Sequence, residues 1–192
     1  MKRGGVAAAV AVTLFFAHAA RAGAAPADSV DPVAAGLDVG TTASSAFVGA
    51  AAASFSLDLP LGHSVSLQLQ PSAYYASGTS VTIFQLTVIT SLRFYVVSLF
   101  VTDPRRQAQW GPFVSGGAAV AWARMLNGST IDAVSFGPDL AAGYRLVFGN
   151  HGIFIEPSVG WMALYGATFN SSKISSAVNT GVVLGMILGW RF

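Results

Sequence analysis

Residues 178–192, Val-Asn-Thr-Gly-Val-Val-Leu-Gly-Met-Ile-Leu-Gly-Trp-Arg-Phe, decide the fold class of this chain. The even-numbered positions are almost all apolar and end in Trp190 and Phe192. The odd-numbered positions are mostly small or polar and end in Arg191. Because successive side chains of a strand point to opposite faces, this segment is expected to form a two-faced strand. It is long enough for a tilted membrane-crossing strand, which needs roughly 9–11 residues.

The composition also indicates a membrane protein that crosses with strands. Only 9% of the residues are charged, against roughly 25% in soluble proteins, while 53% are hydrophobic. Beyond the N-terminal region, the sequence contains no purely apolar stretch of about 18 residues, the length that a membrane helix requires. The 192 residues are typical of a single domain. These features favour a β-barrel over a helical bundle.

The first 24 residues have the pattern of a cleavable signal peptide. Lys2 and Arg3 precede a short apolar core at 6–16, and small residues follow at 20–24. Residues 25–32 are interpreted as a flexible lead-in, and residues 33–192 as the barrel domain. The chain contains no cysteine, which excludes disulfide bonds and a lipid-modified cysteine anchor.

A period-two alternation of apolar and polar residues marks seven strands and a weaker eighth. The strands are predicted at 45–59, 63–77, 81–101, 110–123, 136–148, 153–165 and 178–192, with the weak one at 33–41. Short turns are predicted at 60–62, 103–109 and 149–152, and loops at the opposite end at 77–80, 125–134 and 166–175. Bacterial single-chain barrels have even strand numbers, which supports eight.

Six charged residues fall on the face that the alternation assigns to the interior. They are Asp58, Arg93, Asp139, Arg145, Glu156 and Arg191. An Arg or Lys facing lipid at the bilayer midplane costs roughly 2–4 kcal/mol, so these side chains are expected to point inward. The interior of an eight-stranded barrel is just wide enough to be filled by side chains, and the charges are expected to pair there.

One ion pair follows from the register of a predicted hairpin. A two-residue turn at Asn150-His151, flanked by Gly149 and Gly152, sets Phe148 opposite Ile153. The same register places Arg145 directly opposite Glu156, with both side chains inside the barrel. Directly opposed residues have Cβ atoms roughly 4.5–5.5 Å apart, which is within reach of an ion pair.

With its signal sequence, alternating strands and terminal Phe192, the chain resembles small bacterial outer-membrane β-barrels of the OmpA/OmpX type. The resemblance covers about residues 33–192. It implies an all-β, eight-stranded antiparallel transmembrane barrel, porin-like in architecture, without a periplasmic domain, in the outer membrane of a Gram-negative cell. In that family Trp190 and Phe192 would act as the assembly signal. The implied partners are outer-membrane lipid, the barrel assembly machinery and periplasmic chaperones.

No catalytic, cofactor-binding or metal-binding residues are expected. His18 would leave with the signal peptide, and His63 and His151 fall in predicted turns with no carboxylate placed to orient either ring. The chain has no basic cluster with interleaved aromatic residues, so a nucleic-acid partner is not expected. The favoured function is a structural or surface-interaction role with a packed lumen, and the sequence names no surface ligand. A lipid-modifying enzyme and a narrow pore are the alternatives.

Overall fold

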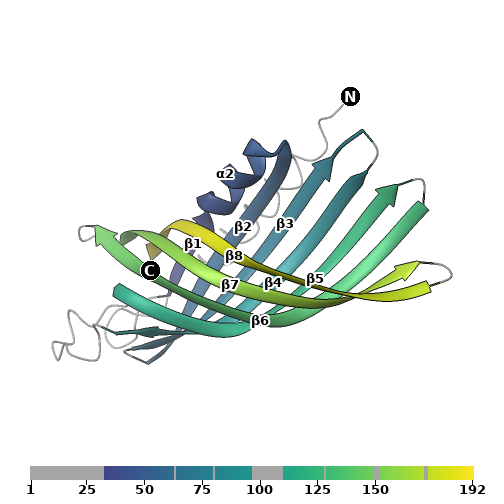
Figure 1. The fold of residues 1–192 in the computed structure, drawn as a ribbon. Coiled ribbons are helices and arrows are strands. Elements are labelled where there is room, and N and C mark those ends of the chain that lie inside the picture. The colour runs from purple at the N-terminus through teal and green to yellow at the C-terminus, as the bar shows by residue number, and fades with distance from the viewer. Residues whose placement is uncertain are drawn as a thin grey trace.

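The computed structural model describes residues 33–62, 64–79, 81–96, 110–127, 129–148, 152–170 and 173–192. Eight antiparallel strands pair in chain order and close into a barrel (Figure 1). The strands are β1 (Ala34–Asp38), β2 (Ala50–Gly62), β3 (Val65–Ser77), β4 (Thr82–Tyr95), β5 (Gly111–Asn127), β6 (Ser129–Phe148), β7 (Ile153–Asn170) and β8 (Lys173–Arg191). The predicted all-β, eight-stranded antiparallel barrel is therefore confirmed. The predicted signal peptide, the lead-in, the turn at 103–109, His63 and His151 lie outside the described residues.

The first strand is shorter than predicted because a helix interrupts it. β1 ends at Asp38, and α2 (Val39–Phe47) follows before β2 begins at Ala50. The predictions of strand at 39–41 and at 45–49 are therefore wrong. The turn predicted at 60–62 is wrong as well, because these residues form the end of β2 and pair with the start of β3. Asp38 caps the helix by accepting a hydrogen bond from the backbone N–H of Thr41, which is a common way to start a helix. In the described parts of the chain, no helix has the length and apolar character needed to cross a membrane.

At the end of the barrel away from Phe192, two predicted loops are strand instead. β5 and β6 occupy all of 125–134 except residue 128, which is outside the described part, and Asn127 pairs with Ser129, so the predicted loop is wrong. β7 and β8 likewise occupy all of 166–175 except residues 171 and 172, which are outside the described part. Polar residues in these segments suit a loop, but strands that project beyond the hydrocarbon layer also have polar residues on both faces. The loop predicted at 77–80 does separate β3 from β4.

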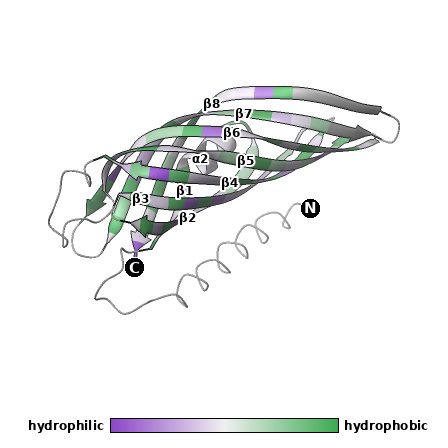
Figure 2. Cartoon of the chain, turned by 90° about the horizontal axis from the view of Figure 1, so that it is seen from below, coloured by the Kyte–Doolittle hydropathy of each residue, from purple (hydrophilic) through white to green (hydrophobic). Residues whose placement is uncertain are grey.

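The wall has an apolar outer face and a polar inner face. Figure 2 shows apolar and polar residues alternating along the strands. On β4, for example, Val88 and Phe94 are each 48% exposed on the outer face, whereas Ser91 and Arg93 are buried inside. Large apolar side chains with this exposure cover the outside of the whole barrel, as a lipid-facing surface requires.

Candidate functional site

Four buried charges form a ring inside the barrel. They are Asp58 on β2, Arg93 on β4, Arg145 on β6 and Glu156 on β7. Each of these residues points to the interior because side chains alternate between the two faces of a strand, and each occupies an inward-facing position. Ile187 of β8 pairs with Glu156, so the ring lies in the half of the barrel that contains Phe192.

The charges alternate in sign around the ring. Arg93 Nη1 lies 3.2 Å from Asp58 Oδ2 and 2.6 Å from Glu156 Oε1. The guanidinium of Arg145 contacts the same two carboxylates: its Nη2 bonds Asp58 Oδ2, and its Nε donates to Glu156 Oε2 at 2.7 Å. Two cations and two anions thus neutralise each other across the lumen.

Aromatic rings complete the packing around both arginines. The guanidinium of Arg93 stacks over Phe113, 4.5 Å from the ring centroid. Arg145 lies 4.4 Å from the centroid of Phe154 and 5.3 Å from that of Tyr95. These three aromatic side chains are at most 1% exposed. Cation–π contacts of this kind partly replace the water that each guanidinium loses on burial.

The ring is electrically neutral and excluded from solvent, so it is stable only when all four charged side chains are present. None of its side chains is more than 4% exposed. Taking charges out of water is costly, and close oppositely charged partners are needed to offset that cost. Loss of one member therefore leaves an uncompensated buried charge, whereas loss of a matched pair does not.

Towards the opposite end of the barrel, a ladder of amide and hydroxyl side chains adjoins the ring. Gln68 donates to Ser56 at 2.8 Å and accepts from Ser91 at 3.2 Å. Gln70 donates to Ser54 at 3.1 Å and to Asp38 at 3.2 Å. The ladder links β2, β3 and β4 to the end of β1, and so fixes where α2 begins.

All six charges predicted to be internal lie on the inward faces of their strands, but only four of them meet. Arg145 and Glu156 are brought together, and the register is the one predicted, with Phe148 opposite Ile153. Asp139 is buried opposite Met162 on β7, and Arg191 lies opposite Ala34 on β1. Within the described residues, neither Asp139 nor Arg191 forms an ion pair. Trp190 and Phe192 lie on the outer face, 55% and 59% exposed.

Sequence reasoning missed the aromatic residues of the ring and the carboxylate of Asp38. Tyr95, Phe113 and Phe154 share the inward parity of the arginines that they contact, and this parity was the available signal. The contact between Asp58 and Arg145 crosses the lumen between residues far apart in sequence, so strand alternation alone gives no sign of it. Among the described residues, no three His, Cys, Asp or Glu side chains gather in a way that could hold a metal ion.

The closed eight-stranded wall, the apolar outer face and the internally paired charges define a transmembrane β-barrel of the outer-membrane class. The solid-state NMR structure of outer membrane protein AlkL in DMPC lipid bilayers has a similar fold, with a TM-score of 0.52 and 12% sequence identity. The similarity covers 88% of this chain and 95% of AlkL. No protein-family model and no curated protein matches the sequence. Similarity to the OmpA/OmpX type in particular remains a prediction.

Proposed function

We propose that this protein is an outer-membrane barrel with a structural or surface-interaction role, a lumen closed in its periplasmic half, and no catalytic activity. The observation that carries the proposal is the buried ring of Asp58, Arg93, Arg145 and Glu156. An open pore would keep such charges hydrated, whereas these side chains are almost completely excluded from solvent. The ring therefore favours a plug over the narrow pore considered as an alternative.

The surface role is supported by the lengths of the strands. β2 and β3 have 13 residues each, but β6 has 20 and β8 has 19. A tilted strand needs roughly 9–11 residues to cross the membrane, so the longer strands extend beyond it. With Phe192 on the periplasmic side, the β5–β6 and β7–β8 hairpins project from the cell surface. Short loops on long hairpins thus still present an accessible surface.

Planar-bilayer recording tests the closed lumen. The purified full-length protein, reconstituted next to a large open porin as the positive control, is expected to give no stable conductance steps. The physical reason is that the ring leaves no hydrated path for ions through the periplasmic half. Regular ohmic steps from the wild-type protein would contradict the proposal and favour the pore.

The absence of catalysis is part of the proposal and has its own test. Mass spectrometry of lipid A from cells with and without the protein is expected to show identical acylation and phosphorylation. A change in lipid A that depends on the protein would favour the lipid-modifying enzyme instead.

A second candidate, sideways passage of small apolar molecules, is favoured by the interior of the outer half. Apart from Asn179 on β8, its inner face on β5 to β8 carries small or apolar side chains: Ala119, Ala121, Ala123, Met125, Ile131, Ala133, Met162, Leu164 and Val183. A Cβ built on Gly181 would meet no atom within 4 Å, so there is room beside this glycine. Because the ring blocks the axial path, a molecule that entered from outside would have to leave through the wall.

Uptake of an apolar fluorescent probe distinguishes this second candidate. Intact cells that produce the protein should take up N-phenyl-1-naphthylamine faster than matched cells that lack it, although the barrel conducts no ions. Equal uptake rates would remove sideways passage and leave the structural or surface role.

A further inference from the structure

Asp139 on β6 is an interior charge that the ring leaves without a partner. Its side chain faces the lumen, and the residue is 8% exposed. Within the described residues, its carboxylate forms no ion pair and accepts no hydrogen bond. A buried charge without a partner is costly, and an ionisable residue at membrane depth points to a functional site.

The nearest inward side chains cannot supply the missing partner. Asp139 lies opposite Gly117 on β5 and Met162 on β7. The inward positions on either side of it along β6 are Gly137 and Ala141, because every second residue of a strand shares a face. None of these four side chains has an N–H or O–H group to donate.

The donors that lie further away are already engaged or are placed beyond the ring. Ser91, two strands from Asp139 in the same row of paired residues, donates its hydroxyl to Gln68. The charge of Arg93 acts on Asp139, but this arginine contacts both acids of the ring. Arg191 lies on the other side of the ring, near Phe192. The carboxylate of Asp139 is therefore available to a partner from outside the protein.

The lumen is open on the side of Asp139 that faces away from the ring. On the ring side, the interior is filled, and Phe154 is 1% exposed. On the open side, Val183 is 36% exposed although it faces inward. Met162 and Gly181 continue the row of Asp139 across β7 and β8, and a Cβ on Gly181 would meet no atom within 4 Å. A molecule that enters from the outer end can therefore reach Asp139.

The walls around this space select the chemistry of that molecule. Met162 and Leu164 on β7 and Ala123 on β5 give the lumen an apolar lining beyond Asp139, and all three are half-buried. A metal ion would find a single acid there, and no group of three possible ligands occurs in the described residues. A primary alkylammonium suits both features. Its N–H groups can donate to the carboxylate, and its alkyl chain can cover the apolar lining.

We propose that the outer half of the lumen binds a primary alkylammonium, with the ammonium group on Asp139 and the alkyl chain against Met162 and Leu164. The charged ring forms the floor of this site. The inference goes beyond the structural role proposed above. It does not depend on passage through the wall, because binding needs only entry from the outer end.

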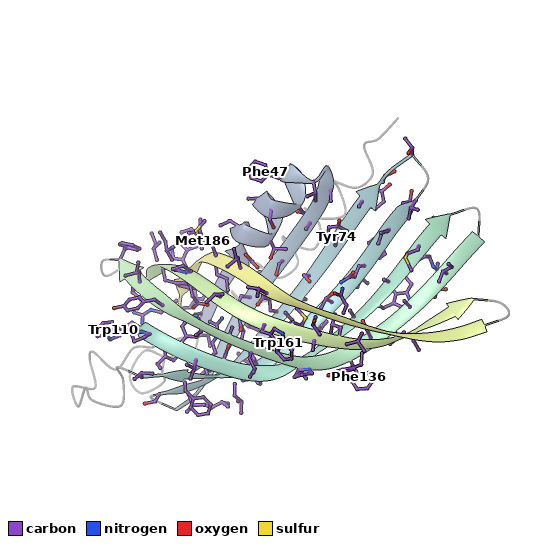
Figure 3. All side chains as sticks on the ribbon, viewed as in Figure 1. Phe47, Tyr74, Trp110, Phe136, Trp161 and Met186 are labelled. Atoms are coloured by element: carbon purple, nitrogen blue, oxygen red, sulfur yellow. The ribbon has the colours of Figure 1, made fainter. Side chains whose placement is uncertain are left out.

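Methyl NMR of the full-length protein in phosphatidylcholine nanodiscs tests the site, with n-hexylammonium as the probe. Methionine labelled with ¹³C in its methyl group places one reporter, Met162, opposite Asp139. A second reporter, Met186, is 42% exposed on the lipid-facing side of β8, close to the start of α2 (Figure 3). The Met162 signal should shift and saturate, whereas Met186 should show at most the linear shift of a probe that partitions into lipid. No saturable shift at Met162 would overturn the proposal.

Two comparisons test the role of the carboxylate. Asp139→Asn keeps the size of the side chain and removes its charge, so it should weaken n-hexylammonium binding about tenfold or more. Asp132→Asn is the matched control, because Asp132 is an outward carboxylate paired with Arg124, and it should leave binding unchanged. Neutral n-hexanol should bind the wild type about tenfold more weakly than n-hexylammonium, or weaker still.

Either of two results would overturn the proposal. One is equal affinity of n-hexylammonium for the wild type and Asp139→Asn, and the other is equal affinity of the two probes for the wild type. The n-hexanol comparison uses only the wild-type protein, so it decides the question even if Asp139→Asn does not fold.

Discussion

At the scale of single residues, the interior charges show what a sequence can and cannot specify. Arg145 and Glu156 could be paired in advance because one short turn fixes the register between them. Asp58 could not be added, because its position relative to Arg145 depends on how the strands tilt around the closed barrel. Asp139 also faces the interior, but it lies at a different level along the barrel axis from the ring. It is opposite Met162 and does not meet an arginine.

Glu156→Gln is predicted to destabilise the barrel strongly. It leaves two arginines with one carboxylate in the dry ring, and an uncompensated buried charge costs roughly 3–5 kcal/mol. The double variant Glu156→Gln with Arg145→Met should recover part of this loss, because Asp58 and Arg93 then remain as a neutral pair. Thermal unfolding in detergent micelles, followed by circular dichroism, measures both.

The exposed pair of Arg124 and Asp132 provides the control for this prediction. Its side chains are 48% and 34% exposed to solvent, which screens the pair, so Asp132→Asn should lower the melting temperature far less than Glu156→Gln does. Equal melting temperatures for the wild type and Glu156→Gln would show that the ring contributes nothing to stability.

Two inward glycines are predicted to differ sharply in their tolerance of a methyl group. A Cβ on Gly143 would lie 2.6 Å from both Phe113 Cζ and the carbonyl oxygen of Pro157. Gly143→Ala should therefore displace the aromatic side chain of Phe113, which stacks on Arg93, and lower the free energy of unfolding by about 1–3 kcal/mol. Gly181→Ala has open space and should stay within about 0.5 kcal/mol of the wild type. The same thermal unfolding assay measures both variants. Similar melting temperatures for Gly143→Ala and Gly181→Ala would refute the tight packing around Gly143.

At the scale of elements, strands with clear alternation were predictable and the β1–α2 segment was not. Between Val39 and Phe47 the residues are all small or hydroxylated, and neither a period of two nor a helical period stands out among them. The available signal was Asp38 with Thr41 three residues later, the spacing of a helix N-cap. Strands that project beyond the membrane were missed for a related reason, since polar residues there fit a loop equally well.

Replacing Phe192 with Lys is predicted to impair insertion into the outer membrane while leaving export across the inner membrane intact. The reason is that Phe192 ends the outward apolar face of β8, the strand proposed to be recognised during assembly. Phe148→Lys is the matched control, because Phe148 is a similarly exposed outward phenylalanine near the same end of the barrel. Cell fractionation with immunoblotting measures both variants. Normal outer-membrane levels of Phe192→Lys, or equal losses in the two variants, would argue against a special role for Phe192.

At the scale of the whole molecule, the barrel has two unlike halves. The half that contains Phe192 has a complete wall of strands and is filled by the charged ring. The opposite half has mostly small or apolar inner residues on β5 to β8, polar ones on β2 to β4, and a helix in place of one strand segment. The low charge content and the alternation predicted the closed barrel, because only a closed sheet or a helix satisfies backbone groups in lipid. They could not predict this division, which depends on where β1 ends.

The chain folds as a closed barrel within the outer membrane. Heat-modifiable gel migration of outer-membrane fractions tests this most directly, because a folded membrane barrel resists unfolding by detergent until it is boiled. The protein should be recovered in this fraction, and boiled and unboiled samples should migrate differently. Recovery in the soluble fraction, or identical migration with and without boiling, would contradict a closed barrel in the outer membrane.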